Sequence, residues 1–271
     1  MFRDGGRSFG VVPRREWLHW VTPDEHNLIP FGLGFYLVQG RGKNILIDAG
    51  IGDKRTPEEE RAMQIERVAS GDSLFESVGI TRDDIDTIIL THLHYASAGG
   101  LTRLNESGTL EPAFPKARIV IQNGEWERAV HTNIRTRDLY NKVDFEPLLW
   151  HGQLQLLDGD EEIHPGIRVH VTGGHTKSHQ IVVIESEGEG CVFWGDLVPS
   201  THHLHLNAVS ALDLYPLISM EKKAEWLDLS VKSGWVSFFA RDAELAAAQI
   251  SGDIRSEAGL RFEALLPHHV E

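Results

Sequence analysis

The sequence has one cysteine, no long apolar run and no cluster of basic residues. Cys191 has no partner for an internal disulfide, and its apolar surroundings in Gly190–Trp194 indicate an ordinary buried thiol. No apolar run approaches the length needed to cross a bilayer, and the first residues lack the apolar core of a signal peptide. These absences predict a cytoplasmic protein with no membrane partner.

Positive charge is also scarce, with 26 Lys and Arg against 40 Asp and Glu and a formal net charge of −14. An acidic surface repels phosphate backbones, so nucleic acid is not expected as a partner. The 271 residues are 41% hydrophobic, enough for a sizeable core. No linker, repeat or low-complexity tract interrupts them, and we therefore expect one domain over residues 1–271.

The hydrophobic pattern predicts an α/β protein, because short apolar runs alternate with segments of helical periodicity. A hairpin is expected from 31–38 and 44–47 around a glycine-rich turn. The other strands predicted are 85–90, 117–122, 154–157, 167–171, 181–185, 191–194, 235–239 and 260–266. The helices predicted are 57–68, 73–78, 124–130, 221–233 and one that begins at Asp242 as N-cap and runs to Ile250.

Three short segments at the ends of predicted strands contain residues suited to metal chemistry. They are Thr91–Gly100, Gly174–Gln180 and Gly195–Asp196. With 15 histidines in the chain, one His-x-His pair is a modest signal, since most histidines are packed or solvated. In an extended segment, however, His92 and His94 point to the same side. With His175 they would form a three-imidazole set, which is common for catalytic zinc.

These segments resemble the metallo-β-lactamase superfamily, which carries Thr-His-x-His-x-Asp-His-x-Gly-Gly, a later Gly-His-Thr and an Asp after a strand. Further stretches resemble its quorum-quenching N-acyl homoserine lactonase-like branch: Phe9–Pro13, Lys43–Asp48, Gly50–Lys54, Gly195–Pro199 and Asp213–Pro216. The resemblance implies a four-layer αββα sandwich. It also implies that His92, His94 and His175 bind a first metal and that Asp196 is the carboxylate that bridges two metals.

The sequence departs from the family at the second metal's ligands. The family's Asp-His stands here as Ala96-Ser97, and Arg241 stands where the branch has a histidine. Alanine offers no ligand atom, and a serine hydroxyl is a poor ligand beside imidazole or carboxylate. Loss of one ligand set with retention of the other suggests selection, or deliberate substitution at positions 96 and 97, rather than random decay. We expect a vacated second metal site.

Arg241 has two interpretations. Without a second cation Asp196 would be a partly buried carboxylate that lacks a partner, and a guanidinium could supply the charge and a forked hydrogen bond. Alternatively, Arg241 precedes a helix cap and points into solvent. We favour pairing with Asp196, and in that case both residues are candidate catalytic groups.

Several other residues are candidates for contacts around the pocket. Tyr95, His203 and Tyr215 are candidate substrate-binding residues, although aromatic packing and a solvated loop are the simpler interpretations. We expect His179 to support a ligand or to be a hydrogen-bonded core residue.

The leading functional hypothesis is a metal-dependent hydrolase of an ester-like bond in a small molecule, with a lactone as the best single guess. It would hold one Zn²⁺ per chain, or another divalent metal, with Asp196 as fourth ligand or as acceptor for bound water. The alternative is an inactive relative that binds a small molecule or a protein in the former pocket. A third hypothesis keeps two metals through His202, His203 or His205. A homodimer is expected on base rate alone.

Overall fold

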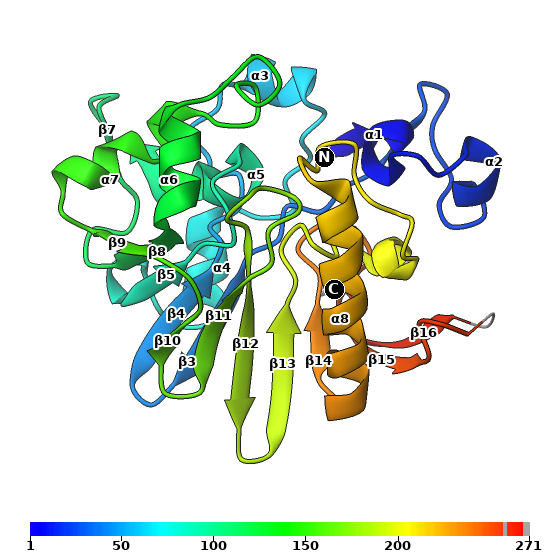
Figure 1. Ribbon diagram of the computed structural model, residues 1–271. Coiled ribbons are helices and arrows are strands. Elements are labelled where there is room, and N and C mark those ends of the chain that lie inside the picture. The colour runs from blue at the N-terminus through cyan, green and yellow to red at the C-terminus, as the bar shows by residue number, and fades with distance from the viewer. Residues whose placement is uncertain (257–258, 268–271) are drawn as a thin grey trace. The chain divides into compact units, whose positions relative to one another are not determined.

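The computed structural model describes residues 1–256 and 259–267. The chain forms two compact units, one made of Leu33–Asp158 and the other of Met1–Gly32 together with the chain from Gly159 onward. Each unit is built on its own large sheet (Figure 1). In the part of the chain that is described, no helix is both long and apolar enough to span a bilayer.

The unit of residues 33–158 contains a five-stranded sheet in the order β3-β4-β5-β8-β9. The strands β3 and β4 form the predicted antiparallel hairpin, and the remaining neighbours are parallel. Ile88 and Val120 are fully buried, as expected for parallel strands covered on both faces. The strands are Tyr36–Gly40 (β3), Lys43–Ile47 (β4), Thr87–Ile89 (β5), Arg118–Gln122 (β8) and Leu154–Leu157 (β9).

Short helices connect these strands. The helix α3 ends at Ala62 rather than at the predicted residue 68, and none of its residues is buried, so no packing extends it. The helices are Pro57–Ala62 (α3), Gly71–Ser77 (α4), Tyr95–Ala98 (α5), Asn123–Val130 (α6) and Glu146–Trp150 (α7), with 3-10 turns at Arg82–Asp84, Gly99–Leu101 and Lys142–Asp144. A small sheet pairs Thr102–Leu104 (β6) with Leu110–Pro112 (β7).

The other unit contains a seven-stranded sheet in the order β10 to β16. All neighbours are antiparallel except β13 and β14, and the crossover between these two runs through the long helix α8, Pro216–Ser233. This helix lies along one face of the sheet, where Leu227 packs in a cluster with Trp194 (Figure 1). The strands are Glu161–His164 (β10), Ile167–Val171 (β11), Gln180–Ser186 (β12), Glu189–Phe193 (β13), Val236–Phe238 (β14), Leu245–Gly252 (β15) and Leu260–Pro267 (β16).

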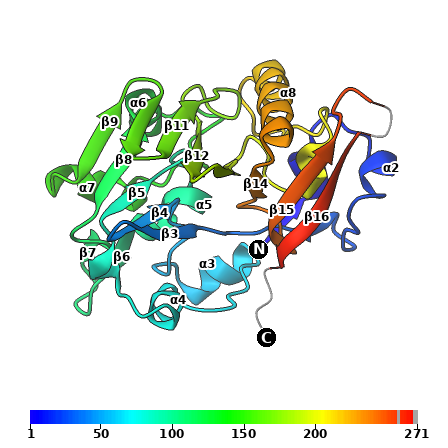
Figure 2. The ribbon, with the colours of Figure 1, turned by 90° about the horizontal axis from the view of Figure 1, so that it is seen from below.

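The helix predicted from Asp242 to Ile250 is wrong, because residues 245–252 form the strand β15. This strand pairs with β14 on one side and with β16 on the other (Figure 2). Alanine favours helices, but two neighbouring strands satisfy the backbone groups of 245–252 along most of their length. Asp242 still accepts backbone hydrogen bonds from Glu244 and Leu245, now as a turn at the start of the strand.

The N-terminal residues complete this second unit. The strands Phe2–Asp4 (β1) and Leu28–Pro30 (β2) pair with each other, and the helices Gly5–Phe9 (α1) and Arg14–Trp17 (α2) lie between them in sequence. Phe9, Trp17 and Ile29 form a small core with Ala208, which follows the 3-10 turn Thr201–Leu204. This core holds the loop of residues 200–210, which lies between Asp196 and α8 in sequence.

Candidate metal centre

His92 is positioned by Asp48, which directly follows β4. The side chain of Asp48 is buried and accepts from the Thr91 backbone N–H at 2.8 Å and from the Thr91 hydroxyl at 3.0 Å. The Thr91 Oγ1 atom also lies 2.9 Å from His92 Nδ1. Because the hydroxyl proton goes to the carboxylate, Oγ1 accepts from Nδ1–H, which leaves Nε2 of His92 as the atom able to bind a metal.

The segment between His92 and His94 is fixed by Glu125 on α6. The Oε1 atom of this fully buried carboxylate accepts from the Leu93 backbone N–H at 3.1 Å and from the Tyr140 hydroxyl at 2.9 Å. Burial, together with the neighbouring Glu125, raises the pKa of Tyr140, so its hydroxyl keeps its proton and donates. The Tyr140 ring packs against the His94 ring with centroids 4.7 Å apart.

His175 follows the turn Gly173–Gly174, where both glycines have positive φ. Its side chain is 1% exposed. Its Nδ1 lies 2.8 Å from Oδ1 of Asp213, and its Nε2 lies 3.4 Å from Oδ2 of Asp196. A carboxylate only accepts hydrogen bonds, so the Asp213 contact places a proton on Nδ1, and Nε2, which faces Asp196, is the nitrogen able to bind a metal.

Asp196 is held at both its backbone and its side chain. Its backbone N–H donates to His179 Nε2 at 3.0 Å, and His179 Nδ1 lies 2.8 Å from the Thr172 hydroxyl. Burial, and to a lesser extent the neighbouring His175, lowers the pKa of His179 to about 3, which keeps this ring neutral and able to accept. His179 therefore supports Asp196, as predicted.

The prediction that Arg241 pairs with Asp196 is confirmed. The Nε atom of Arg241 donates to Asp196 Oδ1 at 2.8 Å, and the side chains are 0% and 7% exposed. The backbone of Arg241 is bonded to Pro199 and Gly32, so the residue is fixed at both levels. This contact excludes the alternative in which Arg241 points into solvent.

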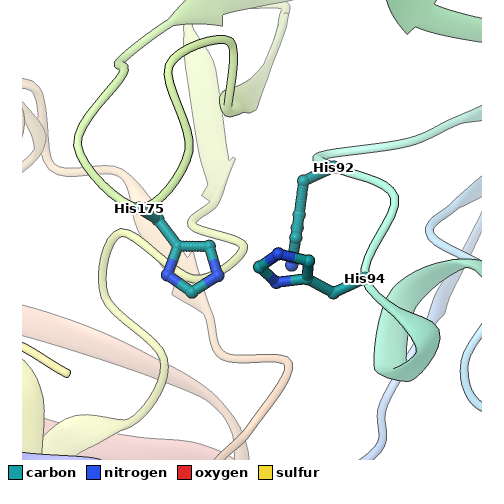
Figure 3. Close-up of side chains that lie close together, drawn as sticks. All are labelled: His92, His94 and His175. Carbon is teal, nitrogen blue, oxygen red and sulfur yellow. The ribbon is translucent and has the colours of Figure 1, made fainter. Parts of the chain in front are cut away.

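The three predicted histidine ligands lie close together (Figure 3). One ring nitrogen of each of His92, His94 and His175 lies within 4.8 Å of the others, and all three side chains are buried. These residues could hold a metal ion, and they are the only such group among the described residues. Asp196 Oδ2 is not part of this group, but it lies 3.4 Å from Nε2 of His175, and a carboxylate oxygen and an imidazole nitrogen are both ligand types that zinc accepts. The donor set therefore fits a cation.

Ala96 and Ser97 lie in α5 and are buried. The Ser97 hydroxyl donates to Asp48 Oδ2 at 2.9 Å, and the Ser97 carbonyl accepts from the Ala49 backbone N–H. Ser97 thus helps to fix the orientation of the Asp48 carboxylate, which positions Thr91 and His92. Its hydroxyl proton is used in this hydrogen bond.

The three candidate substrate contacts have different surroundings. Tyr215 is 37% exposed and directly precedes α8, and Tyr95 begins α5, half-buried, with the Arg55 guanidinium 5.5 Å from its ring centroid. His203 is buried and uses both ring nitrogens, 2.8 Å from Ser200 Oγ and 3.1 Å from the Ser8 carbonyl. Burial lowers the pKa of His203 to about 3. These contacts favour a structural role for His203 and give the two-metal hypothesis no support, since no loop histidine joins the metal-binding group found among the described residues.

The structure adds three carboxylates that sequence reasoning did not assign. Asp48, Glu125 and Asp213 are each at most 5% exposed and each contact a predicted ligand or its neighbour. Asp48 and Asp213 stand in stretches that resemble the lactonase-like branch, and that was an available signal. Glu125 lies on a helix with no distinctive pattern, so nothing in the sequence marks it.

Comparison with known proteins agrees with this geometry. The metallo-beta-lactamase superfamily matches residues 35–236, and the chain belongs to that superfamily. The predicted metallo-β-lactamase fold, of mixed α/β content with several sheets, is thereby confirmed.

The similar proteins include lactonases and a hydrolase. N-acyl homoserine lactonase AiiA of Bacillus thuringiensis subsp. kurstaki is 28% identical over 172 residues, 64% of this chain and 62% of that protein. An N-acyl homoserine lactonase from Bacillus sp is 25% identical over 83% of this chain and 86% of that protein. The crystal structure of a probable metal-dependent hydrolase from Staphylococcus aureus is 29% identical, with a TM-score of 0.90 over 100% of this chain and 94% of that one.

Proposed function

We propose that this protein is a hydrolase that opens an ester-like bond in a small molecule, specifically a lactone, and that it works with one metal ion. Membership of the superfamily and the similarity to N-acyl homoserine lactonases support the hydrolase class. The proposal of a lactone as substrate rests on those relatives. This chain spans 62% of the length of the Bacillus thuringiensis lactonase. The candidate ligands are His92, His94 and His175, and Asp196 lies next to His175.

One observation supports a single metal above all others: the guanidinium of Arg241 is bonded to Asp196. The resemblance implies that this carboxylate bridges two metals in the family. In this chain Oδ1 accepts from a permanent cation, and Oδ2 lies 3.4 Å from Nε2 of His175. Ala96 and Ser97 offer no replacement ligand, so one ion is the number that these residues can hold.

A zinc ion in this position would supply a bound water with a pKa of about 7 and would polarise the scissile carbonyl. The protein's own residues then have separate tasks. Asp196 Oδ2 would accept the proton of the attacking water and pass it to the alkoxide that leaves when the ester C–O bond breaks. Arg241 compensates the charge of Asp196 through the contact between Nε and Oδ1 and adds a permanent positive charge beside it. Tyr95 and Tyr215 remain candidates for substrate contacts, whereas His203 is better placed to hold the loop.

The decisive experiment counts metal in the purified protein and in the triple variant Ala96→Asp/Ser97→His/Arg241→His. We expect about one zinc per wild-type chain and about two in the variant, because the variant restores the ligand types that the second ion needs. Elemental analysis after dialysis against zinc measures both ratios. An unchanged ratio in the variant would refute our assignment of the three positions.

Activity is tested in parallel with an N-acyl homoserine lactone as probe. We expect a chelator to abolish hydrolysis and one equivalent of zinc to restore it. Hydrolysis that persists in chelator would contradict the metal-dependent scheme.

The Arg241–Asp196 pair also favours the alternative, an inactive relative that binds a ligand in the former pocket. The pair neutralises the carboxylate within the protein, so the fold does not depend on a second ion. A purified chain that neither holds zinc nor hydrolyses the probe would support that alternative.

Some expectations from the sequence remain predictions. They are a cytoplasmic location, a homodimer, a single domain over 1–271 and the absence of nucleic-acid and membrane partners.

A further inference from the structure

We infer that Asp213 is a positioning residue for the candidate ligand His175, and that the first turn of α8 holds Asp213 in place. This inference deepens the proposed function, on which its significance for catalysis rests. All the residues that carry it belong to the unit built on the seven-stranded sheet.

The contact between Asp213 and His175 decides which ring nitrogen is available. Oδ1 of Asp213 lies 2.8 Å from Nδ1, which must therefore carry the proton. Nε2, the nitrogen on the side of Asp196, is then the one that would bind a metal. A carboxylate behind a metal-binding imidazole fixes the ring orientation and makes the ligand nitrogen more basic.

The backbone adds two further bonds in the same place. The N–H of Leu214 donates to the His175 carbonyl at 3.1 Å, and the N–H of Tyr215 donates to the Gly174 carbonyl at 2.9 Å. Residues 213–215 thus hold His175 through its ring and through its main chain. Movement of this segment would move the ring with it.

Asp213 is itself held by α8. Its Oδ2 atom accepts a short hydrogen bond from the hydroxyl of Ser219, and both side chains are buried. Asp213 also lies three residues before the start of α8 and interacts electrostatically with Lys223, which is buried as well. The ammonium of Lys223 in turn donates to the carbonyls of His205 and Ala208, which fixes the preceding loop.

Gly174 allows this close approach. It has a φ of +80°, and a Cβ atom on it would lie 2.3 Å from Ser219 Oγ and 2.8 Å from Ser219 Cα. The turn before His175 and the first turn of α8 are therefore in contact at a point where only glycine fits. We call this group the His175 mount: it consists of Asp213, Ser219 and Gly174, and it fixes the orientation of the His175 ring.

The test measures the protonated nitrogen of His175 in the metal-free chain and the affinity for zinc. We expect long-range ¹H–¹⁵N NMR to show Nδ1–H in the wild type. Asp213→Asn can donate to Nδ1 and should move the ring proton to Nε2 in part of the molecules. Zinc affinity, measured by competition with a chelator, should fall about 10- to 100-fold.

Ser219 gives an independent variant if Asp213→Asn fails to fold. Ser219→Ala should weaken zinc binding about fivefold through the lost hydrogen bond, and Ser219→Thr should restore it. Ser230→Ala is the matched control, since this buried hydroxyl lies on the same helix and makes no hydrogen bond with any described residue. It should leave zinc affinity unchanged.

The outcomes separate this inference from the proposed function. Wild-type zinc affinity and an unchanged Nδ1–H signal in Asp213→Asn, or wild-type affinity in Ser219→Ala, would overturn the positioning role while the hydrolase proposal stands. A wild type without lactone hydrolysis, but with an Nδ1–H signal that shifts in Asp213→Asn, would retain the positioning role and remove the hydrolase.

Discussion

The guanidinium of Arg241 and the carboxylate of Asp196 are buried together, and the coupling energy between them can be measured. Both charges would be costly alone in this environment, and each has the other as partner at 2.8 Å. We expect Arg241→Met to lower the free energy of unfolding of the metal-free protein by about 3–5 kcal/mol, because Asp196 then loses its cation.

The double variant Arg241→Met/Asp196→Asn should recover much of that loss, because the uncompensated charge is gone. Urea denaturation of the four proteins of this cycle measures the coupling. Arg103→Met removes one partner of an ion pair that is 41% and 34% exposed and should change stability by less than about 0.5 kcal/mol. Additive losses in the Arg241–Asp196 cycle would contradict the coupling.

Single residues also show how far the sequence leads. The partner of Arg241 could be predicted, because a carboxylate without its metal needs charge and arginine was the available source. Ser97 could be excluded as a ligand, but its bond to Asp48 could not be foreseen, since the two residues are 49 positions apart in sequence. Glu125 was beyond prediction for the same reason, because only the fold places its carboxylate beside the backbone of Leu93.

At the scale of elements, the contact between the turn Gly173–Gly174 and α8 leaves no room for one added methyl group. Gly174→Ala would combine a positive φ with a contact of 2.3 Å to Ser219. We expect it to displace the first turn of α8 from His175 and to reduce zinc affinity about 10-fold or more.

Gly234→Ala is a matched control at the other end of α8. This glycine also has a positive φ, of +66°, but a Cβ atom would find nothing within 4 Å. We expect a loss of stability of about 1 kcal/mol from backbone strain and no change in zinc affinity. Denaturation and chelator competition on both variants distinguish the two effects, and equal zinc affinity in Gly174→Ala would contradict the mount.

Prediction of elements succeeded where local pattern and tertiary structure agree. The strands β8, β9 and β11 and the helix α6 fall where apolar periodicity placed them, within one residue. The run of alanines in β15 has the opposite local preference, and its pairing with β14 and β16 prevails. The start of α8 was predicted five residues late, because Pro216 at its N-terminal end was not used as a start signal.

At the scale of the whole molecule, the buried histidines predict how stability depends on pH. Burial lowers the pKa of His179 and His203 from 6.5 to about 3. Between these values the unfolded chain binds protons that the folded chain does not, so the free energy of unfolding falls as pH falls. Each ring contributes at most about 1.4 kcal/mol per pH unit.

Lys223 extends the same trend to alkaline pH. Burial lowers its pKa from 10.5 to about 7, so the unfolded chain again binds more protons between these values and stability rises with pH. Urea midpoints of the metal-free protein from pH 4 to 10 measure the stability–pH curve on its acid limb, set by the histidines, and on its alkaline limb, set by Lys223. His203→Gln should flatten the acid limb and His19→Gln, at an exposed position, should not. An acid limb of the same slope in His203→Gln would contradict the assignment.

The discontinuous unit of residues 1–32 and 159 onward has a consequence for synthesis on the ribosome. The ring of His203 is hydrogen-bonded to the carbonyl of Ser8, and the carbonyl of Arg241 accepts from the backbone N–H of Gly32. The first residues of the chain therefore cannot complete their contacts until residues 203 and 241 have been made. At about 5–20 residues per second, Arg241 is made several seconds or more after His94. During that interval the nascent chain presents its His-x-His pair without His175, Asp196 or Arg241, so the full set of candidate ligands and charges exists only after residue 241 has been made.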